Sequence, residues 1–188
     1  MAAAGALIVP DTALHRTPTI LQLEAAECGA AALSMVLAYH GRHVPLEQMR
    51  IECGVSRDGS KAGGLLRAAR AYGLVARGFK KEPADLAELP LPSIVFVNFN
   101  HFVVLEGFRK GRVYLNDPAR GRRTVEASGF DQAFTGVVLT FETGPEFKPG
   151  GHGPSVMRSL SQYLEGFQLS IASRIGRSSS WTPRGRTS

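Results

Sequence analysis

In the first half of the chain the apolar positions recur every three or four residues, which is the period of an α-helix. The alanine-rich stretch 28–40 predicts one helix, and Gly41 is placed to end it. A second, short helix with proline in its first turn is expected over 45–53. Ser60 is expected to cap the start of a third helix, which Gly73 ends.

The second half of the chain has a different pattern, in which short runs rich in β-branched and aromatic residues alternate with Pro, Gly and charged residues. Each run is short enough to be one strand. Two further short helices are expected at 83–89 and 126–134. Helices followed by strands indicate an α+β fold, with the N-terminal helices packed on an antiparallel sheet. The expected strands are 74–80, 93–99, 101–108, 112–117 and 135–141.

The composition changes again after Phe147, where Gly and Pro form a linker-like stretch. Beyond this stretch, apolar residues at spacings of three or four predict an amphipathic helix over 154–175, and the serine-rich end is expected to be disordered. We therefore expect a flexible N-terminus over 1–16, one domain over 17–147, and a C-terminal region over 148–188.

The positive charge of the chain is concentrated at its C-terminal end. After Gly151 there are five arginines and one acid, Glu165, so this stretch carries +4 of the net charge of +6 and leaves +2 for residues 1–150. A nearly neutral domain argues against nucleic acid as a partner. The basic, amphipathic tail instead predicts contact with an anionic membrane surface.

Composition also bears on location and cofactors. The chain has no run of about 18 apolar residues, so no transmembrane helix is expected. Its two cysteines are too few for a disulfide framework or a zinc site built on CxxC pairs, which favours a reducing, cytoplasmic compartment. The glycine pair at Gly73 and Gly78 is followed by Phe79, where a phosphate-binding loop requires lysine. The sequence predicts neither a metal site nor a cofactor.

The two cysteines occur in the same triplet, Glu-Cys-Gly, at opposite ends of predicted helices. Cys28 lies in the first turn of its helix, where free N–H groups and the positive end of the helix dipole lower a thiol pKa. Cys53 lies in the last turn of its helix, where the exposed carbonyls favour the neutral thiol. Only Cys28 is therefore placed to act as a nucleophile, and Cys53 is expected to be a small buried hydrophobe.

His101 is the histidine best placed to act as a base for this thiol. It opens a strand whose hairpin partner ends at Asp117, and a three-residue turn would put Asp117 opposite Val103, on the face of His101. A carboxylate on one ring nitrogen leaves the other free to take a proton from sulfur. Gln22, six positions before Cys28, could donate to a tetrahedral oxyanion together with the Cys28 backbone N–H. The other histidines lie in polar chain ends or beside a helix stop, where a structural role is expected (His15, His40, His43 and His152).

These residues fall in stretches that resemble a known family. Residues 22–33 resemble the nucleophile motif of the double-glycine leader peptidases, which are papain-like cysteine peptidase domains at the N-terminus of peptide-exporting ABC transporters. Residues 98–105 and 115–118 are similar to the histidine and aspartate motifs of that family, in the same order. Residues 54–60 resemble the branch that exports peptides with nitrile-hydratase-like leaders. The resemblance runs from about residue 17 to residue 147.

The resemblance implies a papain-like fold and a cysteine endopeptidase that cuts a secreted peptide precursor after a Gly-Gly or Gly-Ala type of pair. Carried over by motif, Cys28 is the nucleophile, His101 the acid and base, Asp117 the residue that orients the imidazole, and Gln22 the oxyanion donor. The implied partners are a leader-bearing precursor and the transmembrane and ATPase parts of an exporter, at the cytoplasmic face of the plasma membrane. Transport itself is not expected of this chain, which continues into neither part. A non-cleaving module that docks the leader is the main alternative, and a papain-like acyl transferase is another.

Overall fold

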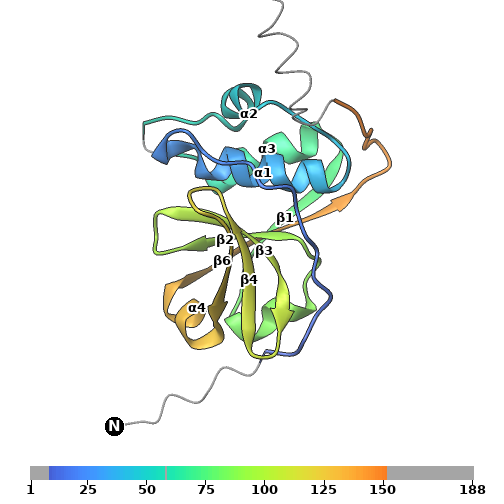
Figure 1. Ribbon diagram of the computed structural model, residues 1–188. Helices are drawn as coiled ribbons and strands as arrows, with labels where there is room; N and C mark the ends of the chain where they lie inside the picture. Colours follow the sequence, from blue (N-terminus) through green and yellow to red (C-terminus); the bar gives the residue numbers. More distant parts are fainter. Residues whose placement is uncertain (1–8, 58, 152–188) are drawn as a thin grey trace, which may run out of the picture. The chain divides into compact units, whose positions relative to one another are not determined.

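The computed structural model describes residues 9–57 and 59–151, in which a layer of helices packs on a six-stranded antiparallel sheet (Figure 1). The predicted amphipathic helix and basic tail lie outside the described residues. No helix in the described part of the chain is long and apolar enough to cross a bilayer. The helices are η1 (Ala25–Glu27), α1 (Cys28–Tyr39), α2 (Leu46–Cys53), α3 (Ala62–Ala71), η2 (Pro83–Glu88) and α4 (Ala127–Ala133). The strands are β1 (Leu74–Lys80), β2 (Ser93–Val97), β3 (His101–Arg109), β4 (Arg112–Asp117), β5 (Gly121–Glu126) and β6 (Phe134–Thr143).

The sheet has the strand order β1-β6-β2-β3-β4-β5 and buries apolar side chains on both faces. Strand β3 shows this alternation: Phe102 and Val104 join the core beneath the helices, whereas Val103 and Leu105 join a second core that includes residues of η2 and α4. The predicted α+β class, with N-terminal helices on an antiparallel sheet, is confirmed.

The helix ends follow local chemistry closely, with one exception. Gly54 ends α2 in the left-handed conformation, as expected of a glycine cap. The predicted cap of α3 is wrong, because the residue before the helix is Lys61. Ser60 instead packs over the start of α1: its Oγ donates to the Ala26 carbonyl at 3.5 Å, and a Cβ on Gly29 would lie 2.5 Å from the Ser60 Cβ. The glycine after Cys28 therefore lets this loop approach the N-terminus of α1.

The sequence pattern missed strand β5. Its residues, GRRTVE, alternate between half-buried and exposed positions at the edge of the sheet, so the strand needs almost no apolar residues. It pairs with β4 over its whole length, from Arg112 opposite Glu126 to Asp117 opposite Gly121. The arginines of this strand were therefore not predicted as part of the site, although Arg123 contacts Asp117 there.

The β3–β4 hairpin has the predicted pairing near Asp117, but its turn is shorter than predicted and β3 contains a bulge. Its turn has two residues, Lys110 and Gly111, which places Arg109 opposite Arg112. Continued to the far end, this register would put Asp117 on the opposite face from His101, because a shift of one residue exchanges the two faces of a strand. One extra residue in β3, between Leu105 and Gly107, restores the predicted pairing. The bulge at Glu106 thus decides which face Asp117 occupies.

A buried polar network surrounds this bulge. The Glu106 carboxylate is almost fully buried and accepts hydrogen bonds from the backbone N–H of Thr17 at 2.7 Å and from Arg122 Nε at 2.9 Å. Asn116 Nδ2 donates to the Thr17 carbonyl at 3.1 Å, and Arg122 donates to the same oxygen at 2.7 Å. Each buried polar group in this set has a partner, so the network stabilises the bulge and not a regular strand.

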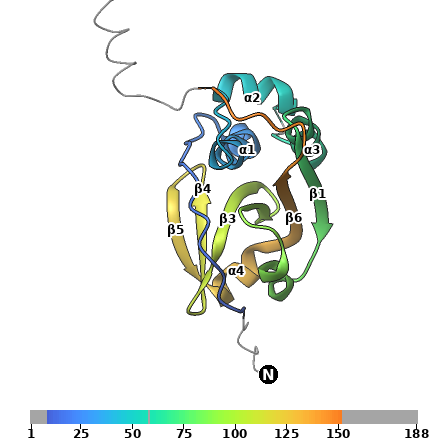
Figure 2. The ribbon, with the colours of Figure 1, turned by 90° about the vertical axis from the view of Figure 1, so that its right-hand side faces the viewer.

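The segment before residue 17 lies along the sheet, where the sequence predicted a flexible end. The Thr12 N–H donates to the Phe108 carbonyl at 2.9 Å, the His15 N–H donates to the Glu106 carbonyl at 2.8 Å, and Val9 is buried. Figure 2 shows this blue segment crossing the sheet from the helical layer toward the opposite end. Residues 9–16 are therefore held by backbone hydrogen bonds that no local pattern reveals, and residues 1–8 lie outside the described part.

Replacing Gly107 with alanine is expected to destabilise the domain by about 2–4 kcal/mol. Gly107 has a φ of 149°, and an added Cβ would lie 2.7 Å from the Ala13 carbonyl oxygen, so the change strains the backbone and pushes the N-terminal segment away. Chemical denaturation would measure the free energy of unfolding. Gly63→Ala is the matched control, because a Cβ there meets nothing within 4 Å and alanine favours the helix. Equal stability of the two variants would contradict this account of the bulge.

Candidate active site

The thiol of Cys28 is held at the first position of α1, against the start of β3. Burial by itself raises the pKa of this thiol, but hydrogen bonds from the His101 side chain and the Phe102 backbone outweigh burial and lower the pKa below its usual value. The charge of His101 and the Gly29 N–H act in the same direction. The sequence predicted a lowered pKa from helix position; in the structure, the hydrogen bonds from His101 and Phe102 lower this pKa more than the one from the Gly29 N–H at the helix start.

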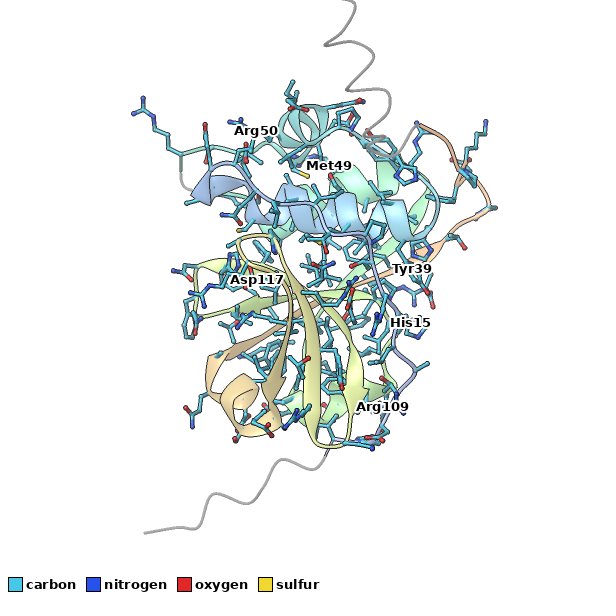
Figure 3. All side chains as sticks on the ribbon, viewed as in Figure 1. His15, Tyr39, Met49, Arg50, Arg109 and Asp117 are labelled. Carbon is cyan, nitrogen blue, oxygen red and sulfur yellow. The ribbon has the colours of Figure 1, made fainter. Side chains whose placement is uncertain are left out.

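His101 and Asp117 are joined directly, with His101 Nε2 at 2.7 Å from Asp117 Oδ1. Because Nε2 meets the carboxylate, Nδ1 is the ring nitrogen available to the Cys28 thiol. The hydrogen bond to Asp117, followed by that to Cys28, raises the pKa of His101 to about 9. Figure 3 places Asp117 at the end of the sheet near the helices, far from Arg109 at the turn of the same hairpin.

Asp117 is itself held by three groups. Burial raises the pKa of its carboxyl, but the hydrogen bonds from His101 and from the Ala119 N–H outweigh burial and keep the pKa below its usual value. Arg123 Nε lies 3.0 Å from Asp117 Oδ2 and adds a favourable charge. Arg123 belongs to β5, so sequence reasoning did not find it.

Cys53 has the opposite environment. It is 2% exposed, and burial, followed by the charge of Glu52, raises the pKa of its thiol to about 12. Arg67 opposes this shift without cancelling it. Cys53 is therefore buried, as predicted, and burial is the largest cause of its raised pKa.

Gln22 lies beside the same site. Its backbone N–H donates to the Pro118 carbonyl at 2.9 Å, which ties the segment before η1 to the turn after Asp117. Its side chain lines a pocket together with His101 and Asp117. Its Oε1 is buried and has no hydrogen-bond partner among the described residues.

Glu27, directly before Cys28, is a second residue that sequence reasoning missed. Its side chain is fully buried, and its Oε2 accepts hydrogen bonds from the backbone N–H groups of Leu23 and Glu24 at 2.7 and 2.9 Å. Arg50 of α2, labelled in Figure 3, pairs with Glu27 Oε1 at 2.8 Å. The pair holds the loop that carries Gln22 against the helices. A glutamate three residues after Glu24 at a helix start was the available signal.

Two pockets flank the pair formed by Cys28 and His101. One, of about 380 Å³, is lined by Cys28 and not by His101, and aromatic side chains form part of its wall. The other, of about 360 Å³, is lined by His101 and not by Cys28, and polar and basic side chains surround it. Ala25 and Asn100 line both, so the two pockets adjoin. The first also includes Arg57, Phe96, Phe99 and Phe102; the second includes Gln22, Asn98, Asp117, Arg120 and Arg123.

The remaining described histidines lie elsewhere. His15 Nδ1 is 2.8 Å from the Tyr39 hydroxyl, a contact visible in Figure 3, and this joins the N-terminal segment to α1. Burial lowers the pKa of His40. Neither lines the two pockets beside Cys28, and His152 lies outside the described residues.

The different environments of the two thiols predict selective alkylation. At pH 7, iodoacetamide is expected to modify Cys28 at least about a hundredfold faster than Cys53, because only the thiolate reacts. Peptide mass spectrometry after timed quenching would give both rates. Labelling in denaturant is the control, since both thiols should then react alike. Equal rates in the folded protein would contradict the assignment of a lowered Cys28 pKa.

A thiol at a helix N-terminus, hydrogen-bonded to a histidine at the start of a sheet strand, is the arrangement of a papain-like cysteine peptidase. Comparison with known proteins agrees with this class. The chain belongs to the peptidase C39 family, whose family model matches residues 16–146.

Its relatives include a secretion/processing protein and two peptidase domains whose structures have been solved. The probable microcin-H47 secretion/processing ATP-binding protein MchF of Escherichia coli is 34% identical over 159 residues, which are 84% of this chain and 23% of MchF. The chain thus spans about a quarter of the length of this curated relative. A crystal structure of a double glycine motif protease from an AMS/PCAT transporter, in complex with the leader peptide, is 52% identical with a TM-score of 0.68, covering 69% of this chain and 94% of that one. The peptidase domain of Streptococcus ComA, at 22% identity and a TM-score of 0.64, covers 68% of this chain and 99% of its own, and shows the shared fold.

Proposed function

We propose that this chain is a cysteine endopeptidase that removes the leader of a secreted peptide precursor by cutting after a Gly-Gly or Gly-Ala type of pair. The observation that carries the proposal is that His101 adjoins the Cys28 thiol and lowers its pKa, while His101 Nε2 lies 2.7 Å from Asp117 Oδ1. The similarity to a double glycine motif protease crystallised with its leader peptide supports the choice of substrate. The nitrile-hydratase-like branch of such leaders remains a prediction of residues 54–60.

In this proposal Cys28 is the nucleophile. Its Sγ forms a bond to the carbonyl carbon of the second small residue, and the thiol proton resides on His101. The carbonyl oxygen becomes an oxyanion, which the Cys28 backbone N–H and the Gln22 side-chain amide stabilise. The place of Gln22 supports this role, since its side chain lines the same pocket as His101 and its amide N–H groups are donors.

The intermediate then collapses with proton transfer from His101. The C–N bond breaks, the leaving amine takes the proton from His101, and the leader remains as a thioester on Cys28. Water attacks the thioester with His101 as base, which releases the leader carboxylate and restores the thiol. Asp117 holds the imidazole orientation throughout, through its 2.7 Å contact with Nε2.

We further propose that the domain works with the transmembrane and ATPase parts of an ABC exporter, at the cytoplasmic face of the plasma membrane. The names of curated relatives support this, because they join secretion, processing and ATP binding in one protein. Residues 154–177 are proposed to contact a membrane surface or the exporter, from their apolar stripe and the positive charge of the C-terminal tail.

The proposal is tested by incubating the protein with a synthetic precursor that carries a Gly-Gly leader, followed by mass spectrometry. We expect two products whose masses sum to the precursor plus one water. Binding of the precursor without any shorter product would indicate a docking module instead. A product bearing an added acceptor group would indicate acyl transfer.

A further inference from the structure

The two pockets beside Cys28 and His101 differ in the side chains of their walls and in the reactive group that each contains. The pocket that holds Cys28 has three phenylalanines and one arginine, Arg57, in its wall, whereas the pocket that holds His101 has, among the described residues, no aromatic side chain but His101 itself and contains Arg120 and Arg123. We call the second one the arginine pocket. This division of the two reactive groups gives a direction to the substrate.

Reaction chemistry assigns each pocket to one side of the cleaved bond, given the proposed function on which this inference rests. The acyl carbon bonds to Cys28, so the residues before the bond lie on the Cys28 side. The leaving amine receives its proton from His101, so the residues after the bond lie on the His101 side. We infer that the arginine pocket binds the first residues after the cleavage site, and that Arg120 makes it favour acidic residues and disfavour basic ones.

The charges in the arginine pocket leave one cation unpaired. Asp117 lies between His101 and Arg123, at 2.7 Å from the imidazole and 3.0 Å from the guanidinium, and so forms an ion pair with Arg123. Arg120 has no ion pair within residues 9–57 and 59–151, and its side chain is exposed. Its place is nonetheless set by the chain, because its backbone N–H donates to the Asp117 carbonyl at 3.1 Å in the turn that follows β4.

An exposed cation in a groove acts on charged substrates by a modest amount. A single exposed ion pair changes affinity by up to about fivefold, and a like charge acts in the opposite direction by a similar factor. The ratio of kcat/KM for an acidic over a basic substrate is therefore expected to be about tenfold for the natural protein. Salt should reduce this ratio, because the charges are open to solvent.

The test uses three precursors that differ only in the two residues after the Gly-Gly pair: Asp-Asp, Ser-Ser and Lys-Lys. Each is cleaved by the full chain, by Arg120→Glu and by the matched control Arg109→Glu. Arg109 is an exposed arginine at the far end of the β3–β4 hairpin, so it undergoes the same charge change far from the site (Figure 3). Initial rates at low substrate give kcat/KM, and measurements at low and high salt separate charge effects from shape.

We expect the natural protein and Arg109→Glu to prefer Asp-Asp, and Arg120→Glu to prefer Lys-Lys. An unchanged preference in Arg120→Glu, or no preference in the natural protein, would overturn the inference while leaving the peptidase assignment intact. Failure of the natural protein to cleave any of the three precursors would overturn the proposed function itself. Thermal unfolding of each variant shows whether it is folded, and the Ser-Ser precursor reports its basal activity.

Discussion

Cys28→Ala is expected to lower kcat/KM for a Gly-Gly precursor by at least about a thousandfold, because no other group can form the thioester. The substitution changes only the Cys28 side chain and leaves the rest of the substrate-binding surface intact, so the variant should still bind the precursor. A fluorescence assay on a labelled precursor gives the rate, and mass spectrometry identifies the products.

Cys53→Ala is the matched control for that variant. It removes a thiol of the same type from the same triplet, but Cys53 is buried at the end of α2 with a pKa of about 12. We expect cleavage within about twofold of the natural protein, together with a stability loss of about 1 kcal/mol for the small cavity. Full activity in Cys28→Ala, or loss of activity only in Cys53→Ala, would reject Cys28 as nucleophile.

Asp117→Ala is expected to cause the second-largest loss, about a hundredfold in kcat/KM. The carboxylate fixes the ring through Nε2 and is the leading reason that the pKa of His101 rises to about 9. Without it the imidazole can rotate, and the protonated form that must donate to the leaving amine is less favoured. Asp117→Asn separates these effects, since it retains an oxygen for the ring N–H and loses the charge, so its loss should be smaller.

The pH profile gives the sign of the charge effect. In the natural protein His101 must be protonated to release the amine, so cleavage should fall as pH rises through about 9. Both Asp117 variants lower the pKa of His101, so their alkaline limb should move to lower pH. Asp117 also contacts Arg123, so its replacement could affect folding. Circular dichroism of each variant is the control for this effect. An alkaline limb that stays in place in both variants would contradict the role of the carboxylate.

Local pattern was sufficient for much of this fold. Helix α1 begins at Cys28 and α2 ends before Gly54, because helix propensity, proline and glycine act within a few residues. The five predicted strands were located in the same way, from runs of β-branched and aromatic residues, and they correspond to β1, β2, β3, β4 and β6. Strand β5 was not predicted, because an edge strand exposes alternate residues and can be built from arginines.

The site shows the same division. Cys28, His101, Asp117 and Gln22 were selected from the sequence, since a thiol at a helix start and a histidine with a cross-strand carboxylate are recognisable patterns. Glu27 and Arg123 were not, because each matters through a contact with a distant residue: Arg50 of α2 and Asp117 of β4. Burial of a charge is a tertiary property, and no local pattern reports it.

The sequence by itself determined the elements and the chemical groups of this protein: a cysteine at a helix N-terminus, and a histidine and an aspartate on two strands of one hairpin. Only the tertiary structure decided how these groups meet. The hairpin has a shorter turn than predicted, and the bulge at Glu106 returns Asp117 to the face of His101. That bulge is stabilised by Thr17 and Arg122, which lie 89 and 16 residues away along the chain. Non-local contacts contribute to register here, because both faces of this sheet bury apolar side chains and the alternation within one strand does not fix which face packs under the helices.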